Sequence, residues 1–320
     1  MGSKPPLRPP ALAPGCRVAL VAPSAALLER DDLRRAEALC RALGFEPVLG
    51  AHAGARHGYF AGTDAERLAD LNGALRDPSI DAVWCIRGGV GLTRILDDID
   101  FEALARRPRA VIGFSDVTAL LAGVRGVSGV IAFHAPMARA PMPEFSRVHF
   151  LRVLAGAEPA GRLTALPQPS DVLLPVENRV VAIRGGQAEG PLVGGNLTLL
   201  QHLVATRYFP ELEGALLFLE DVGEALYRVD RMLAQLRTIG ALARVAGVIV
   251  GRFTEMRRET GDGAFGFDEV LEHYFGGLGV PVLIGAPIGH IDAQWTVPIG
   301  VRARLDADAG DVELLEAAVR

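Results

Sequence analysis

Short apolar runs alternate with helix-like segments over the first 135 residues of the chain. Four of these runs are predicted to be buried strands: 17–22, 82–86, 110–113 and 129–133. Between the first two runs, apolar residues recur at three-to-four spacing over 33–43 and again around 66–75, which predicts two amphipathic helices. Because short apolar strands alternate with helices, we expect an α/β fold whose parallel sheet is covered on both faces.

The pattern changes between residues 140 and 190, where prolines and polar turns interrupt every long element. The prolines are Pro141, Pro143, Pro159, Pro167, Pro169 and Pro175. Beyond this region, further apolar runs are predicted to be strands: 191–193, 215–219, 245–250, 282–284 and 297–305. We therefore predict four parts in chain order: a disordered, proline-rich leader (1–14), an N-terminal domain (15–150), a linker region (151–190) and a C-terminal domain (191–320).

The composition is that of an ordinary globular protein, since half of the 320 residues are apolar and 22% are charged. The net charge of -5 argues against a general nucleic-acid binder, because neutralising phosphates requires a basic surface. No segment reaches the roughly 20 uninterrupted apolar residues that a membrane span requires. We expect a protein that binds neither nucleic acid nor membrane.

The N-terminus and the cysteines favour a cytoplasmic location. Basic residues precede an apolar stretch, as in a signal peptide, but prolines and Arg17 interrupt that stretch. Cys16, Cys40 and Cys85 are too few for a disulfide framework and are not spaced as zinc ligands. We therefore expect a reducing compartment and no metal.

Candidate chemical groups follow the predicted strands, at the edge where parallel strands end and ligands commonly bind. The glycine-rich segment 87–91 suits close approach of an anion, or is only a tight turn. Ser115 stands at a strand-to-helix turn, where it is either an exposed nucleophile or the N-cap of the helix. Glu220 and His290 follow later strands. The plainer interpretation of Glu220 is a surface charge, and that of His290 is a structural histidine that only makes hydrogen bonds.

Two neighbouring features affect these interpretations. Asp221 and Glu224 have the spacing of a helix N-cap and its partner three residues on, so capping accounts for both and leaves Glu220 without such a role. His134 is the other histidine that directly follows an apolar run in a turn. It competes with His290 for the role of base.

Taken together, these positions predict a serine hydrolase. A hydroxyl nucleophile needs a base of near-neutral pKa, which His290 supplies, and the base needs an orienting acid, which Glu220 could be. The backbone amides of Gly89 and Asp116 could donate to the developing oxyanion. The chain order serine, acid, histidine is one known for such triads.

The sequence resembles the LD-carboxypeptidase family of serine peptidases, which also contains microcin C immunity peptidases. The resemblance covers most of the chain, from about residue 18 to 305. It rests on five motifs in order: Arg87-Gly88-Gly89, Gly113-Phe114-Ser115-Asp116, Gly194-Gly195-Asn196-Leu197, Phe218-Leu219-Glu220-Asp221 and Gly289-His290. It implies an N-terminal domain like that of class I glutamine amidotransferases and a C-terminal β/α domain.

The resemblance also implies site residues and a reaction. It identifies Ser115 as nucleophile, His290 as base and Glu220 as its orienting acid, and it brings Asn196 near the substrate pocket. The implied reaction cleaves the bond before the terminal D-alanine of murein tetrapeptides during cell-wall recycling, without metal or cofactor. A homodimer and a small peptide substrate are expected.

Specificity is open at the level of the sequence. A carboxypeptidase must bind a free carboxylate, and Arg87 is a candidate, although an arginine at a strand end also commonly braces loop carbonyls. Val90, Ala135 and Leu121 stand where the family often has tyrosine, glycine and histidine. The alternatives are a hydrolase of aminoacyl-nucleotide toxins and a non-catalytic peptide-binding module.

Overall fold

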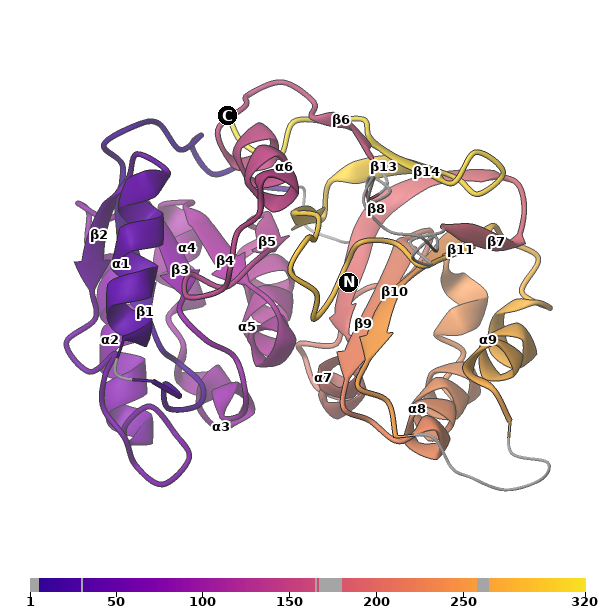
Figure 1. The fold of residues 1–320 in the computed structure, drawn as a ribbon, viewed down its shortest axis with the longest axis horizontal. Coiled ribbons are helices and arrows are strands. Elements are labelled where there is room, and N and C mark those ends of the chain that lie inside the picture. The colour runs from indigo at the N-terminus through magenta and orange to yellow at the C-terminus, as the bar shows by residue number, and fades with distance from the viewer. Residues whose placement is uncertain (1–5, 30, 165, 167–179, 258–264) are drawn as a thin grey trace, which may run out of the picture.

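The computed structural model describes residues 6–29, 31–164, 166, 180–257 and 265–320, which form two lobes side by side (Figure 1). Each lobe is built on its own sheet. In this part of the chain, no helix is both long enough and apolar enough to cross a membrane. The α/β fold class predicted from the sequence is confirmed.

The sheet of the N-terminal lobe has the strand order β12-β5-β4-β3-β1-β2. Its strands are β1 (Arg17–Val21), β2 (Glu46–Leu49), β3 (Ala82–Cys85), β4 (Ala110–Gly113), β5 (Ala132–His134) and β12 (Val297–Ile299). All of the pairings are parallel except that of β12 with β5. Every residue of β3 and β4 is buried, as expected for central strands covered on both faces.

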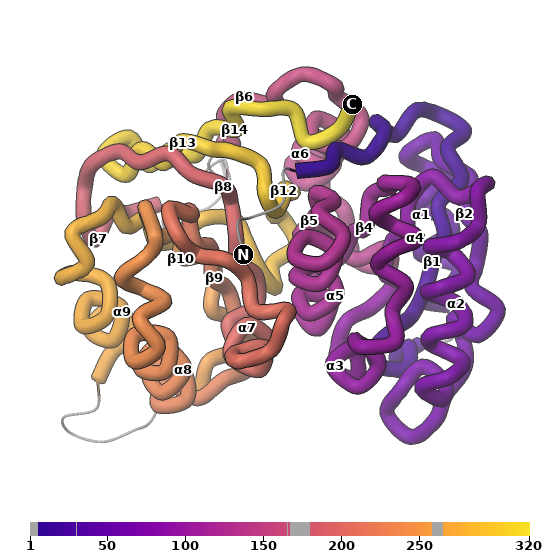
Figure 2. The backbone as a smooth tube through the Cα atoms, turned by 180° about the vertical axis from the view of Figure 1, so that it is seen from behind, coloured from indigo at the N-terminus to yellow at the C-terminus, as the bar shows by residue number. Residues whose placement is uncertain are grey.

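Helices on both faces provide that cover, with α1 on one side and α2 and α4 on the other (Figures 1 and 2). The helices of this lobe are α1 (Asp32–Ala42), α2 (Asp64–Arg76), α3 (Leu92–Ile95), α4 (Phe101–Arg106), α5 (Thr118–Gly123) and α6 (Glu144–Leu154). Short helical turns are η1 (Leu96–Asp98), η2 (Ser115–Val117) and the π-helical η3 (Val124–Ser128). The structure confirms the two helices predicted around 33–43 and 66–75.

The sheet of the C-terminal lobe has the order β6-β14-β13-β8-β9-β10-β11-β7. Its strands are β6 (Gly161–Leu163), β7 (Val181–Arg184), β8 (Gln187–Asn196), β9 (Leu216–Val222), β10 (Gly247–Thr254), β11 (Val282–Ile284), β13 (Arg302–Asp306) and β14 (Asp311–Leu314). The four strands from β8 to β11 are parallel. Helices α7 (Leu197–Leu203), α8 (Leu226–Thr238) and α9 (Phe267–Phe275) follow the parallel strands, and η4 (Leu242–Arg244) precedes β10.

The predicted leader and linker differ from what the structure shows. Residues 1–5 lie outside the described part, but Leu7 bridges Val130 and Leu12 is buried, so the chain is ordered from residue 6. The backbone of Pro9 accepts a hydrogen bond from the amide of Arg320, which holds this segment beside the C-terminal residue. In the linker, β6 and β7 join the second sheet, whereas Pro167, Pro169 and Pro175 lie outside the described residues.

The predicted strand 297–305 is two strands in two different sheets. Gly300, with φ of 98°, separates β12 from β13. β12 pairs with β5 of the first sheet, and β13 pairs with β8 of the second. The C-terminal part of the chain therefore contributes an edge strand to the N-terminal lobe, and the two sheets are joined near the site described next.

Candidate functional site

Ser115 occupies a strained turn directly after β4. Its φ of 61° lies in the left-handed region, which is uncommon for a residue other than glycine and is typical of a nucleophile held on a sharp strand-to-helix turn. The N-cap residues of η2 and α5 are Phe114 and Val117, and the Ser115 hydroxyl contacts His290 instead. The interpretation of Ser115 as a helix N-cap is therefore wrong.

His290 reaches Ser115 from the loop after β11. Its Nε2 lies 3.1 Å from the Ser115 hydroxyl oxygen, and its Nδ1 lies 2.8 Å from Oε2 of Glu220. A carboxylate only accepts hydrogen bonds, so Nδ1 donates to Glu220 and Nε2 is left to accept from the serine. Ser115 follows β4, Glu220 lies within the second half of β9, and His290 lies in the loop after β11.

Glu220 is fully buried, so it is not a surface charge. Its close approach to His290 depends on Gly289, which has φ of 119°. A Cβ at Gly289 would lie only 2.9 Å from the Cβ of Glu220. The glycine of the Gly289-His290 motif thus lets the histidine-bearing turn pack directly on the buried carboxylate.

His134 is not placed to act as the base. It is fully buried between Phe114 and Phe218, with ring centroids 5.5 Å and 5.3 Å away. Neither ring nitrogen has a hydrogen-bond partner among the described residues. Burial lowers the pKa of His134 to about 3, so its ring stays neutral at ordinary pH.

The glycine-rich segment 87–91 wraps the nucleophile. Gly88 packs against Ser115, since a Cβ there would lie 3.1 Å from the serine Cβ. Gly89 has φ of 107°, and a Cβ on it would lie 2.5 Å from that of Ala25. Gly89 is exposed, and Asp116 follows Ser115 at the start of η2. Asp116 thus adjoins Ser115 in the chain, and Gly89 adjoins Gly88, which packs on that serine, while the oxyanion role of the two amides stays a prediction.

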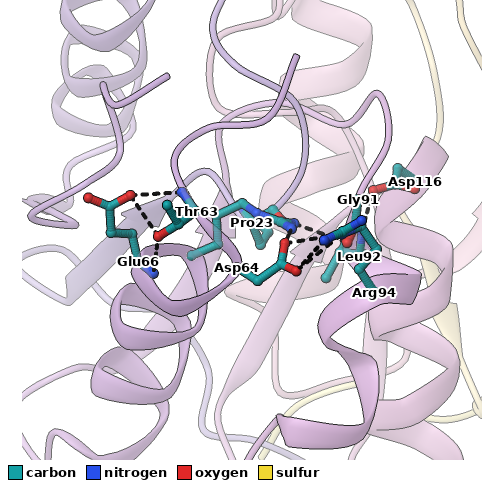
Figure 3. Close-up of polar contacts among 9 residues, drawn as sticks. Pro23, Thr63, Asp64, Glu66, Gly91, Leu92, Arg94 and Asp116 are labelled. Carbon is teal, nitrogen blue, oxygen red and sulfur yellow. Dashed lines mark hydrogen bonds and ion pairs between the residues drawn. The ribbon is translucent and has the colours of Figure 1, made fainter. Parts of the chain in front are cut away.

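A buried arginine that the sequence analysis missed braces the end of this glycine segment. Arg67 of α2 is 1% exposed and donates from Nη1 to the carbonyls of Pro23, at 2.5 Å, and Gly91, at 3.0 Å. It also pairs with Asp64, and Asp64 forms a second ion pair with Arg94 (Figure 3). The sequence carries a signal for it, because Arg67 falls on the apolar stripe of its helix.

The carboxylate of Asp116 completes the brace. Its Oδ2 accepts from the backbone amide of Leu92 at 3.0 Å (Figure 3). Burial raises the pKa of this carboxyl, and the charge of Arg67 opposes that rise. The end of the glycine segment is thus tied by backbone hydrogen bonds to the residue that follows Ser115.

We expect Arg67→Met to lower the free energy of unfolding by about 3 kcal/mol, because it removes a buried charge that donates to two loop carbonyls and pairs with Asp64. Urea denaturation measures the change. The matched control is Arg94→Met, which removes an ion pair to the same Asp64, but from a side chain that is 57% exposed. An exposed ion pair contributes at most about 1 kcal/mol. Equal, small losses of unfolding free energy in the two variants would contradict the view that Arg67 holds the end of the glycine segment in place.

The structure gives Asn196 a structural position. Its Oδ1 accepts from the amide of Leu199 and caps α7, and its Nδ2 donates to Oδ1 of Asp221 at 2.9 Å. Its own amide donates to the hydroxyl of Thr118 at 3.1 Å. Both ends of the side chain are occupied by protein groups, so its geometry does not favour the expected contact with substrate.

Asp221 does not cap the following helix, as its spacing had suggested. β9 continues through Val222, and α8 begins only at Leu226. Asp221 is buried and instead accepts from the amide and the hydroxyl of Thr198, at 2.9 Å and 2.8 Å. Burial raises the pKa of its carboxyl. Asp221 thus holds the start of α7 beside the strand that carries Glu220.

Arg87 is half-buried and donates from Nη1 to the carbonyl of Ala26. The bracing of a loop carbonyl, which was the plainer interpretation of this residue, is therefore present.

Comparisons with known proteins identify the family. The model of the LD-carboxypeptidase N-terminal domain matches residues 18–135, and that of the C-terminal domain matches residues 189–305. The chain belongs to the LD-carboxypeptidase family. The resemblance predicted from the five sequence motifs is confirmed, and the protein is a serine-type peptidase of this family.

Two kinds of relative are similar to this LD-carboxypeptidase. The murein tetrapeptide carboxypeptidase of Pseudomonas aeruginosa is 34% identical, over 91% of this chain and 94% of its own. A crystal structure of muramoyltetrapeptide carboxypeptidase from Oxalobacter formigenes has a TM-score of 0.79 at 31% identity, covering 93% and 97%. The microcin C7 self-immunity protein of Escherichia coli is 27% identical over 85% of each chain. A structure of the microcin C7 self-immunity protein with aspartyl sulfamoyl adenosine gives a TM-score of 0.89 at 26% identity, covering 98% and 100%.

Proposed function

We propose that this LD-carboxypeptidase removes the terminal D-alanine of murein tetrapeptides, with Ser115, His290 and Glu220 as its catalytic triad. The observation that carries the proposal is the continuous hydrogen-bonded path from Ser115 through His290 to the buried Glu220, at 3.1 Å and 2.8 Å. Nucleophile, base and orienting acid within hydrogen-bond reach are the signature of covalent acyl transfer.

The reaction follows from the positions of these groups. Ser115 Oγ attacks the carbonyl carbon of the bond before D-alanine while His290 Nε2 takes its proton. The amides of Gly89 and Asp116 donate to the oxygen that becomes negative. The imidazolium then protonates the leaving amine, and D-alanine departs from the acyl-enzyme. Water, deprotonated by His290, attacks the acyl carbon, and Ser115 Oγ regains its proton from the histidine.

The cellular setting that we propose is cell-wall recycling in the cytoplasm, by a homodimer. The P. aeruginosa relative, named for murein tetrapeptide, supports this substrate over others. The alternative is hydrolysis of an aminoacyl-nucleotide, and it is favoured by the 0.89 TM-score to the microcin C7 self-immunity protein. Both reactions would use the same triad, so they differ in what the pocket accepts.

A direct test uses L-Ala-γ-D-Glu-meso-diaminopimelate-D-Ala, with mass spectrometry to detect the loss of one alanine. An aspartyl-nucleotide analogue, aspartyl sulfamoyl adenosine, is incubated in parallel. We expect release of D-alanine and much slower cleavage of the nucleotide. Faster turnover of the nucleotide would establish the alternative. Absence of turnover together with no labelling by a fluorophosphonate would indicate the non-catalytic binding module.

A further inference from the structure

Three loops of the N-terminal lobe meet beside Gly88, the residue that packs on Ser115. The amide of Ala25, after β1, donates to the carbonyl of Gly88 at 3.2 Å. The amide of Ala138, after β5, donates to the carbonyl of Cys85 at 3.0 Å. The buried Met137 side chain packs against Gly88 from this second loop. The three loops therefore pack together at the residue that lies against Ser115.

Arginines are concentrated where these loops meet. Arg87 directly precedes Gly88 and is half-buried, and Arg139 lies two residues after Met137 with 28% of its side chain exposed. Arg56, which is exposed, donates to the carbonyl of Leu27 at 2.8 Å. Burial, followed by the charge of Arg139, lowers the pKa of Arg87, and Arg56 acts in the same direction. The geometry brings the three together, because Arg87 and Arg56 bind the consecutive carbonyls of Ala26 and Leu27, and Arg139 contacts Asp32 five residues on.

Asp32 is an acidic group in the same cluster, and its carboxylate already binds several protein groups. It is fully buried and accepts from the amides of Leu28 and Glu29, at 3.0 Å and 3.1 Å. It lies 3.3 Å from the Nη1 of Arg139 and 3.6 Å from Arg35. Asp32 therefore fixes Arg139 in place, and Glu29 pairs with Arg35. These two carboxylates do not balance the four positive charges of Arg35, Arg56, Arg87 and Arg139.

We infer that Arg87 and Arg139 together bind the free carboxylate of the substrate's terminal D-amino acid, with Asp32 positioning Arg139. This inference rests on the proposed carboxypeptidase function. Like charges held together in a partly buried place are costly without a counter-charge, and a guanidinium matches a carboxylate through two parallel hydrogen bonds. The hydrogen bond from Arg87 to the carbonyl of Ala26 holds Nη1 in place. Among the described residues, the other guanidinium nitrogens of Arg87 can then donate to a ligand.

The location of the pair explains why it would recognise the terminal residue. Arg87 is covalently joined to Gly88, and Gly88 flanks the serine that attacks the bond before that residue. The carboxylate of the leaving amino acid lies only a few bonds from the attacked carbonyl. A cation beside the glycine segment can therefore reach it while the oxyanion amides hold the carbonyl oxygen.

The test compares the tetrapeptide with its C-terminal amide in the full-length protein. We expect Arg139→Met to lower kcat/KM on the free acid by roughly 10- to 100-fold, the usual effect of losing a charged hydrogen bond, and by less than about threefold on the amide. Arg87→Met should act in the same direction. Arg139→Lys should lose less than Arg139→Met, because it keeps the charge but not the bidentate geometry. The matched control is Arg34→Met on α1, an arginine that is 86% exposed.

Equal losses on acid and amide would overturn the inference and show that these arginines only hold the loops. A second measurement separates this outcome from failure of the proposed function. D-alanine should slow fluorophosphonate labelling of wild-type Ser115, D-alaninamide should not, and Arg139→Met should abolish the difference. If the wild type cleaves neither tetrapeptide form, the proposed function fails. The labelling competition alone then decides the inference, and equal labelling with both competitors would refute it.

Discussion

Replacement of Ser115 by alanine is expected to remove nearly all peptidase activity while leaving the fold intact. The hydroxyl is the only group lost, and in the structure it contacts the imidazole of His290 rather than a helix amide. Losing a nucleophile that acts together with its base lowers kcat by roughly 10⁴- to 10⁶-fold. Release of D-alanine and fluorophosphonate labelling should both disappear, with a melting temperature within a few degrees of the wild type.

The matched control is Ser79→Ala, which removes a serine hydroxyl bonded only locally, to Asp77 on the surface. That variant should keep full turnover. Near-normal turnover in Ser115→Ala, accompanied by a lower melting temperature, would show that Ser115 has only a structural role.

The parts of the fold that could be predicted are those with strong local patterns. β3 and β4 are buried at every position, so their apolar runs are unambiguous. β2 was not predicted, because it is an edge strand with no buried residue and contains Pro47. The run at 297–305 was recognised as extended, but periodicity carries no information about which sheet a strand joins. Only the three-dimensional path separates β12 from β13.

Composition was misleading for the N-terminal segment. Many prolines before residue 14 suggested a disordered leader, since proline cannot continue regular elements. Proline is nevertheless compatible with an extended segment, and residues around Leu7 run beside Val130 as a bridge. The burial of Leu12 against the rest of the core then holds the segment in place.

Residues of the site differ in how far the sequence reveals them. Ser115, Glu220 and His290 directly follow apolar runs, and the carboxyl ends of parallel strands meet at one edge, so their convergence could be expected. Arg139 is in a loop whose course is set by packing against Gly88, and no local pattern gives that course. Asp221 was misassigned because its spacing imitates a cap, whereas the strand continues past it.

Replacement of Glu220 by glutamine is expected to lower kcat/KM by roughly 10³- to 10⁴-fold without unfolding the protein. Glutamine has nearly the shape of glutamate, so the fully buried site and its contact with Gly289 are preserved. A neutral amide no longer stabilises the imidazolium that forms when Ser115 gives up its proton. Its NH₂ group can also donate to Nδ1 of His290, which places the ring proton on Nε2, where it cannot accept from the serine.

The consequences of Glu220→Gln are distinct from those of simple destabilisation. Fluorophosphonate labelling of Ser115 should slow in parallel with peptide turnover, because both need the histidine as base, and the melting temperature should stay within a few degrees. Glu213→Gln, at an exposed position before β9, is the matched control and should behave as wild type. A loss in kcat/KM that is matched by a fall in melting temperature would mean that Glu220 mainly supports packing. Full activity in Glu220→Gln would exclude it from the triad, because a base with no charged partner would then suffice to activate Ser115.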